Sequence, residues 1–158
     1  VGPLISKRQH KMVSQYLEDP QGAMVVAKGK ISNGLPKDGY YIAPTLLVAD
    51  DQQSKLAQEE IFGPVMSVFR FSDEEEVIRR ANATDYGLAA GVFTQNLARG
   101  HRVIAQLQAG TCWINTYNVT PIELPFGGNK QSGLGREGSH HGVEEYLEMK
   151  YMLMGGLE

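Results

Sequence analysis

The segment Glu59–Pro64 of this 158-residue chain places two carboxylates shortly before a glycine–proline pair. Glycine and proline together favour a tight turn, and the apolar run that follows predicts a strand. We expect the turn to hold one carboxylate and the Phe62 ring at the carboxyl edge of a parallel sheet, where α/β folds bind ligands. There a carboxylate accepts hydrogen bonds from two ribose hydroxyls while the ring packs on a planar ligand. The alternative is a solvated acidic pair ahead of an ordinary turn.

A second candidate is the glycine-rich run Pro125–Glu137, which contains four glycines. Glycines let the backbone approach a ligand or ion closely, and bare carbonyls in such a run can hold a hard monovalent or divalent cation. Glu137 is suited to shuttling protons if its side chain points inward. The alternative is a surface loop that ends in an Arg136–Glu137 pair, and the spacing leaves both open.

Cys112 is the only cysteine, so the chain forms no internal disulfide and suits a reducing compartment. It lies in the middle of the apolar run Thr111–Ile114. A lone cysteine in a strand is most often a small buried hydrophobe. We therefore assign no thiol chemistry to Cys112.

The elements that must position these candidates follow from hydrophobic patterning. Val65–Phe71 is short, β-branched and aromatic, which predicts a strand. Ser72 as N-cap and Glu75 at the third helical position form a capping box that starts a helix. Residues 82–87 end this helix.

The same pattern then repeats. Leu88–Thr94 predicts a second strand, Asn96 caps a second helix, Gly110 closes it, and Thr111–Ile114 predicts a third strand. Strands and helices that alternate at these lengths imply right-handed crossovers and a parallel sheet covered by helices. The predicted fold class is therefore α/β.

Upstream, apolar spacing predicts a helix over Ser6–Leu17 and strands at Met24–Ala27 and Thr45–Val48. Downstream, residues 115–142 form a long Gly- and Pro-rich stretch, and a loop of that length is usually functional. The run Lys150–Met154 is apolar on both faces and predicts a strand that pairs with another chain.

The net charge of −3 gives no electrostatic footprint for nucleic acid or an acidic membrane surface. No run approaches the ~20 apolar residues of a spanning helix. The chain begins Val1-Gly2-Pro3 without a Met or a basic region followed by an apolar run, so we expect no signal peptide. We expect a piece of a longer cytoplasmic protein.

The motifs together resemble the aldehyde dehydrogenase superfamily from Gly2 through Lys150. Four segments match at the family's spacing and in its order: Glu59–Pro64, Leu88–Phe93, Ala109–Asn115 and the glycine-rich run. The resemblance implies that residues 1–143 are the C-terminal part of the catalytic domain and that residues 144–158 form a β oligomerisation arm.

The resemblance also implies an activity that needs NAD+ or NADP+ as cofactor and an aldehyde as substrate, in a homo-oligomeric dimer or tetramer. In the family a cysteine thiolate attacks the aldehyde and a glutamate activates the water that releases the acid. Both positions precede Val1, and Cys112 lacks the family's nucleophile context. We therefore expect the 158-residue chain by itself to be inactive.

By position in the family's motifs, Glu60 holds the nicotinamide ribose, with Phe62 beside the nicotinamide. Thr120 and Phe126 occupy positions that line the aldehyde pocket. In the betaine aldehyde dehydrogenase branch, Glu137 matches a charge-relay carboxylate. The backbone carbonyls of Lys130 and Gly133 match a potassium site there.

The segment Tyr117–Phe126 most resembles the betaine aldehyde and trimethylaminobutyraldehyde dehydrogenases. An aromatic ring near an acid, with no arginine, suits a quaternary ammonium through cation–π attraction. Arg136–Ser139 and Val143–Met152 instead resemble succinate-semialdehyde dehydrogenases, which leaves that substrate or another aminoaldehyde as the alternative. A hypothesis of another class is a non-catalytic assembly module built on the Lys150–Met154 strand.

Overall fold

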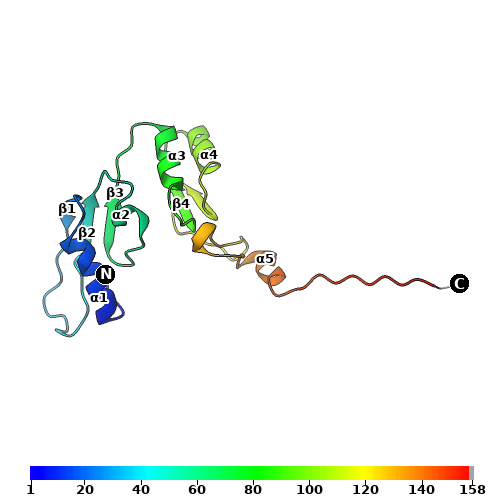
Figure 1. Cartoon of the computed structure of the whole chain (residues 1–158), viewed down its shortest axis with the longest axis horizontal. Helices are drawn as coiled ribbons and strands as arrows, with labels where there is room; N and C mark the ends of the chain where they lie inside the picture. The colour runs from blue at the N-terminus through cyan, green and yellow to red at the C-terminus, as the bar shows by residue number, and fades with distance from the viewer. Residues whose placement is uncertain (157–158) are drawn as a thin grey trace. The chain divides into compact units, whose positions relative to one another are not determined.

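The structure is a computed structural model that describes residues 1–156, and the chain divides into two compact units, Val1–Arg80 and Ala81–Glu158. The first contains helix α1 (Lys7–Glu18), strands β1 (Met24–Lys28) and β2 (Thr45–Val48), helix α2 (Lys55–Gln58) and strand β3 (Val65–Val68) (Figure 1). Helix α3 (Glu74–Asn82) begins in the first unit and ends in the second. The second unit contains β4 (Ala89–Val92), α4 (Leu97–Ile104), β5 (Thr111–Ile114), the 3₁₀ turn η1 (Lys130–Ser132) and α5 (Ser139–Glu144).

The first unit is built on a three-stranded sheet in the order β1-β2-β3. Strand β2 pairs antiparallel with β1 and parallel with β3, in the register Thr45↔Val65 to Val48↔Val68. Every residue of β1 is exposed, although its sequence is mostly apolar. The central strand β2 therefore supplies the buried layer of this sheet.

Helix α1 covers that layer as its spacing predicted. The Ser6 Oγ accepts a hydrogen bond from the Gln9 N–H at 3.2 Å, which satisfies one of the unpaired donors at the helix start. Val13 and Leu47 are fully buried, and Leu56 and Ile61 complete the core around them. The core thus joins α1 and β2 to the segment that carries the first candidate site.

The start of α3 differs from the predicted capping box by one residue. The Asp73 Oδ1, not the Ser72 hydroxyl, accepts from a helical N–H, that of Glu76, at 2.8 Å. The Glu76 carboxylate reaches back to the Ser72 N–H at 2.8 Å and to its hydroxyl at 2.7 Å. Serine and aspartate are both good N-caps, so the sequence contained two overlapping boxes and the structure uses the later one.

The second unit confirms the predicted strand–helix–strand repeat. Strands β4 and β5 pair in parallel and α4 contacts both. The Asn96 Oδ1 caps α4 by accepting from the Arg99 N–H at 3.0 Å. Val103 on α4 and Trp113 on β5 form the buried core.

One expectation for this region was wrong. Gly110 does not close α4, because the helix ends at Ile104 with Ala105 as its C-cap, and Gly110 leads into β5. Within its own unit β3 pairs with β2, and β4 pairs with β5. Consecutive strands are often neighbours but not always, and periodicity cannot decide which pairs form.

The tail that follows α5 contains no helix or strand in residues 145–156. Tyr151, Met152, Leu153 and Met154 are all largely exposed, Met152 at 87%. Helix α5 itself runs across the predicted boundary between residues 143 and 144. Among residues 1–156, no helix is long and apolar enough to span a membrane.

Candidate functional site

The turn Glu59–Pro64 connects α2 to β3. Glu59 follows the last residue of α2 with an extended backbone, at φ −110° and ψ 148°. Phe62 has a φ of 51°, the left-handed region that a ring-bearing residue rarely adopts. Because the turn precedes β3, it lies at the amino end of the parallel pair β2–β3, so the expected position at the carboxyl edge of a parallel sheet was wrong.

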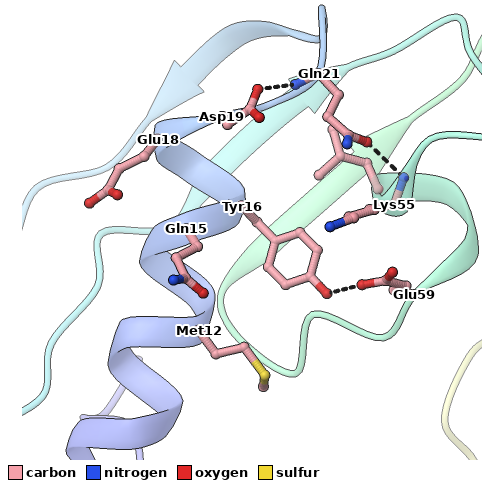
Figure 2. A pocket seen from close by; sticks show the side chains of 9 residues that line it. Met12, Gln15, Tyr16, Glu18, Asp19, Gln21, Lys55 and Glu59 are labelled. Carbon is pink, nitrogen blue, oxygen red and sulfur yellow. Dashed lines mark hydrogen bonds between the residues drawn. The ribbon is translucent and has the colours of Figure 1, made fainter.

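Helix α1 contacts this turn through side chains. The Gln9 amide donates to the carbonyls of Ile61 at 3.3 Å and Phe62 at 2.9 Å. The Tyr16 hydroxyl donates to the Glu59 carboxylate at 2.5 Å, and Figure 2 shows the tyrosine reaching from α1 toward the end of α2. The turn is therefore fixed by residues more than forty positions earlier in the chain.

The structure separates the two neighbouring carboxylates. Both side chains are exposed, but Glu59 is bonded to Tyr16, whereas Glu60 makes no hydrogen bond or ion pair among residues 1–156. Phe62 is 71% exposed. The Glu60 carboxylate and the Phe62 ring of the same turn are thus accessible at the surface.

A pocket of about 580 Å³ lies beside this turn, between α1 and α2. Its lining residues are Met12, Gln15, Tyr16, Glu18, Asp19, Gln21, Lys55, Leu56 and Glu59 (Figure 2). The lining includes Glu59 but neither Glu60 nor Phe62. The pocket therefore marks how α1 and α2 meet, and the two candidate ligand-binding side chains lie outside it.

The glycine-rich run Pro125–Glu137 is held by close backbone contacts and by side chains of its own residues. A Cβ on Gly110 would lie 1.9 Å from the Gly127 carbonyl oxygen, so these two backbone segments are in direct contact. The Arg136 guanidinium donates to the carbonyls of Gly128 at 2.8 Å and Gly135 at 2.7 Å, and to the Asn129 side chain at 2.7 Å. The glycines therefore bring backbone close to backbone.

The two residues matched to a cation site lie around η1. Lys130 has a φ of 54° and Gly133 a φ of 148°, so both carbonyls belong to unusual backbone. The Lys130 ammonium donates to the carbonyls of Asn82 at 2.8 Å and Thr84 at 3.0 Å. Its charge thus anchors the run to the segment after α3.

Thr120 and Phe126 line one pocket of about 380 Å³ in the second unit. Its lining residues are Gly110, Thr111, Cys112, Trp113, Thr116, Val119, Thr120, Pro121, Leu124, Pro125 and Phe126. The Trp113 indole N–H donates to the Val119 carbonyl at 2.9 Å, and the Tyr117 ring packs on the indole with centroids 5.0 Å apart. Apolar and aromatic groups with a few polar ones are the usual lining of a small-molecule site.

Glu137 lies next to this pocket through its backbone. Its N–H and carbonyl each bond to Phe126 at 2.8 Å, which forms an isolated antiparallel bridge. The Glu137 side chain itself is exposed. The structure therefore places the candidate relay carboxylate directly opposite a candidate pocket residue, which their separation in sequence does not reveal.

Cys112 is half-buried on β5 and contributes to the same pocket. Burial raises the pKa of its thiol above the usual 9.0, which disfavours the thiolate. A cysteine nucleophile needs the opposite shift. This agrees with the interpretation of Cys112 as a small, unreactive packing residue.

One cluster was missed by the sequence analysis. A ligand atom from each of His140, His141 and Glu144 lies within 4.8 Å of the others, and all three residues are exposed. Adjacent histidines followed by a glutamate three and four positions later were the available signal. The His141 Nδ1 lies 3.1 Å from the Glu144 carboxylate, so an ordinary exposed pair on a helix explains the cluster equally well.

Comparisons with known proteins identify chains that are similar to this one. A model for the aldehyde dehydrogenase family matches residues 1–152. A betaine aldehyde dehydrogenase from Rhizobium etli is 51% identical over 157 residues, covering 98% of this chain and 32% of that protein. The chain therefore spans about a third of the length of the curated relatives that it matches.

The chain is also similar to solved structures of aldehyde dehydrogenases. The NAD+ complex of an aldehyde dehydrogenase from Bacillus cereus is 47% identical with a TM-score of 0.86, over 94% of this chain and 30% of that one. A betaine aldehyde dehydrogenase from Staphylococcus aureus in complex with NAD+ is 36% identical with a TM-score of 0.85, over 92% of this chain and 29% of that one.

Proposed function

The chain belongs to the aldehyde dehydrogenase family, and we propose that the intact protein oxidises an aldehyde to a carboxylic acid with NAD+ or NADP+ as hydride acceptor. The observation that carries this proposal is the turn Glu59–Pro64, which presents the Glu60 carboxylate and the Phe62 ring at the surface and is held by α1. The residues that attack the aldehyde and activate water belong to the rest of the protein. This chain supplies groups that orient cofactor and substrate.

The residues of the turn fit a nicotinamide dinucleotide. The cofactor supplies the hydride acceptor. The Glu60 carboxylate accepts hydrogen bonds from ribose hydroxyls, and because it has no competing partner among residues 1–156, both of its oxygens are available. The Phe62 ring offers an apolar face to the nicotinamide and excludes water beside it. Holding the ring of the cofactor in one position contributes to rate because misplacement by about 1 Å can cost ~100-fold.

Betaine aldehyde is the proposed substrate. Thr120 and Phe126 line the pocket of about 380 Å³, which is mostly apolar and contains the Trp113 indole. A quaternary ammonium cannot donate hydrogen bonds and is recognised by aromatic faces, and no arginine or lysine lines this pocket. The curated relative from Rhizobium etli is a betaine aldehyde dehydrogenase, which favours the same substrate.

Two further roles are proposed for the glycine-rich run. The carbonyls of Lys130 and Gly133 are suited to holding a potassium ion, since the backbone around them is already bent and the Lys130 ammonium is bonded elsewhere. Glu137 is proposed as the charge-relay carboxylate, positioned through its main-chain bridge to Phe126.

The substrate proposal is tested by the formation of NADH in the intact enzyme. We expect the kcat/KM for betaine aldehyde to exceed that for succinate semialdehyde by at least about tenfold, the ratio that a 1.4 kcal/mol difference in transition-state binding produces. The reverse order would assign the enzyme to the succinate-semialdehyde branch. The isolated 158-residue chain serves as the negative control and is expected to form no NADH.

The cofactor proposal is tested by Glu60→Gln in the intact enzyme. Glutamine keeps the size of the side chain but weakens the hydrogen bonds to the ribose, so single-turnover hydride transfer should slow by about 10-fold or more. Glu75→Gln, at an exposed helix position, is the matched control. A wild-type transfer rate in Glu60→Gln would show that Glu60 is only a solvated acid.

Oligomerisation through the tail is tested separately. The exposed apolar run Lys150–Met154 is proposed to pair with another subunit, and the same feature favours the second candidate function, a non-catalytic assembly module. Met152→Pro removes one ladder hydrogen bond, so the mass in light scattering should fall before helical content does. An unchanged mass with earlier melting would place the strand inside the subunit. Oligomers that form without any turnover by the intact protein would favour the assembly module.

A further inference from the structure

Three residues of α1 that share one face all contact the turn after α2. Gln9, Val13 and Tyr16 are spaced four and three residues apart, which puts them on the same side of a helix. Gln9 bonds to the carbonyls of Ile61 and Phe62, and Tyr16 bonds to Glu59. Val13 packs so closely on Gly63 that a Cβ there would lie 2.8 Å from a valine methyl. The turn is thus held along its length by one helix.

We propose that the Tyr16–Glu59 hydrogen bond is a positioning device that aims the Glu60 carboxylate away from α1 and toward the cofactor. The inference rests on the proposed role of Glu60 and adds two positioning residues to it. Neither Tyr16 nor Glu59 needs to contact the cofactor or the substrate.

The backbone conformation of the turn links the direction of the Glu60 side chain to that of Glu59. Glu59 has an extended backbone, and successive side chains of extended backbone point to opposite sides. Because Tyr16 holds the Glu59 carboxylate against α1, Glu60 must point the other way. A rotation of the turn that freed Glu59 would bring Glu60 toward the α1–α2 pocket, where Glu18 and Asp19 already provide acidic groups.

The remaining contacts explain why the turn needs support. The backbone of Phe62 lies in the left-handed region, a strained conformation for a residue with a side chain, which persists only where its surroundings enforce it. The Gln9 amide donates to the Phe62 carbonyl itself and so stabilises that conformation. Helix α1 therefore supports the turn at two points. Tyr16 bonds to Glu59, the first residue of the turn, and Gln9 bonds to the carbonyl of Phe62, which carries the exposed ring.

The test uses the intact enzyme and removes the Tyr16–Glu59 hydrogen bond by replacing either the donor or the acceptor. Tyr16→Phe keeps the ring and deletes the hydroxyl, and Glu59→Leu deletes the acceptor. Each should raise the KM for NAD+ by about 3- to 10-fold, the effect of losing a hydrogen bond of roughly 1 kcal/mol, with a smaller change in the KM for aldehyde. The double variant should be no worse than either single one. Glu59→Gln keeps an acceptor oxygen and should restore values near those of wild type.

Tyr86→Phe is the matched control for the loss of a hydroxyl from an exposed tyrosine. A second measurement, hydrogen exchange of the amides in residues 59–63, reports on the turn without reference to catalysis. Exchange should be faster in Tyr16→Phe than in wild type or in Tyr86→Phe.

The outcomes separate this inference from the proposed function. If Glu60→Gln impairs hydride transfer while Tyr16→Phe and Glu59→Leu keep the wild-type KM for NAD+, the positioning role is wrong and the cofactor role stands. If Glu60→Gln has no effect, the cofactor role fails, and with it the aim of Glu60 toward a cofactor. Additive effects in the double variant, or unchanged exchange in Tyr16→Phe, overturn the positioning role in either case.

Discussion

The two candidate loops are fixed by different kinds of contact. The turn Glu59–Pro64 is held from outside by side chains of α1, and these contacts join residues 43 to 53 positions apart. The run Pro125–Glu137 is held by backbone contacts and by Arg136 from within the same run. The turn contains Gly63 and the run packs on Gly110, and neither glycine can be replaced freely, but for different reasons.

Gly63 and Gly110 show the difference most clearly. A Cβ at Gly63 would meet the methyl groups of Val13 at 2.8 and 2.9 Å, whereas a Cβ at Gly110 would meet the Gly127 carbonyl at 1.9 Å. A side chain can rotate or be replaced. A backbone carbonyl in a bonded loop can move only if the loop moves. Side-chain support therefore leaves the first loop adjustable, and backbone support leaves the second one rigid.

The largest expected effect is at Gly110. Gly110→Ala should destabilise the intact protein by about 3 kcal/mol or more, because the clash is with main chain and no nearby change of rotamer relieves it. The fall in the denaturation midpoint is the measurement. Gly155→Ala, whose Cβ would meet nothing within 4 Å, should leave the midpoint unchanged. A midpoint in Gly110→Ala equal to that of this control would show that the loop is not rigid.

Gly63→Ala should cost less, about 1–3 kcal/mol, because a side chain must adapt. Val13 is fully buried, so Val13→Ala also destabilises by removing two methyl groups. In the double variant the new methyl occupies the vacated space, and the loss should be smaller than the sum of the two single losses. Strict additivity in this cycle would contradict the packing of Gly63 on Val13.

Arg136→Lys should destabilise by about 1–2 kcal/mol. Lysine keeps the charge but cannot donate in a planar fork to the Gly128 carbonyl and the Asn129 side chain together. The thermal midpoint of the intact protein measures the effect. Arg8→Lys, at an exposed position of α1, is the comparison for a change of arginine to lysine outside the loop. Equal midpoints for the two variants would remove Arg136 from the support of the run.

The smallest effect lies outside both loops, at the start of α3. Hydrogen bonds from the Ser72 hydroxyl and N–H, with Arg80 nearby, lower the pKa of Glu76 from 4.5 to about 2. Because the pKa of Glu76 is lower in the folded state, ionised Glu76 stabilises the fold above pH 4.5. This stabilisation is lost as the pH falls from 4.5 toward 2. Glu76→Gln should therefore melt earlier than wild type at pH 7, and the difference should narrow by pH 3. Glu75→Gln, at an exposed position of the same helix, is the control variant for the loss of a negative charge from α3.

The sequence predicted helices, strands and caps correctly where residues within a few positions of one another determine them. The predicted strand Thr111–Ile114 and the Asn96 cap appear as expected, because alternation and a side-chain oxygen one residue before a helix act within a few positions. The same holds for α1, where Ser6 and the apolar spacing lie within one segment. At α3 two local caps competed, and only the folded chain chose Asp73.

The residue types of the candidate site could also be read from the sequence. The pattern before Gly63-Pro64 pointed to one carboxylate and an aromatic ring. The resemblance to the family assigned these roles to Glu60 and Phe62, and the pocket positions to Thr120 and Phe126. Their membership in one pocket, and the bridge between Phe126 and Glu137, could not be read in the same way. These contacts depend on how a long loop without hydrophobic periodicity returns on itself.

The sequence by itself determined the elements, the carboxylates and the glycines, because residue type and short-range spacing control backbone conformation and chemistry. Only the tertiary structure decided that β3 pairs with β2 and that the turn lies at the amino end of those strands. It also decided that the Tyr16 hydroxyl bonds to Glu59 and leaves Glu60 without a partner among residues 1–156. Each of these decisions joins segments far apart in the chain. Burial of Val13 and Leu47 in a common core brings the segments together, and no local pattern contains that information.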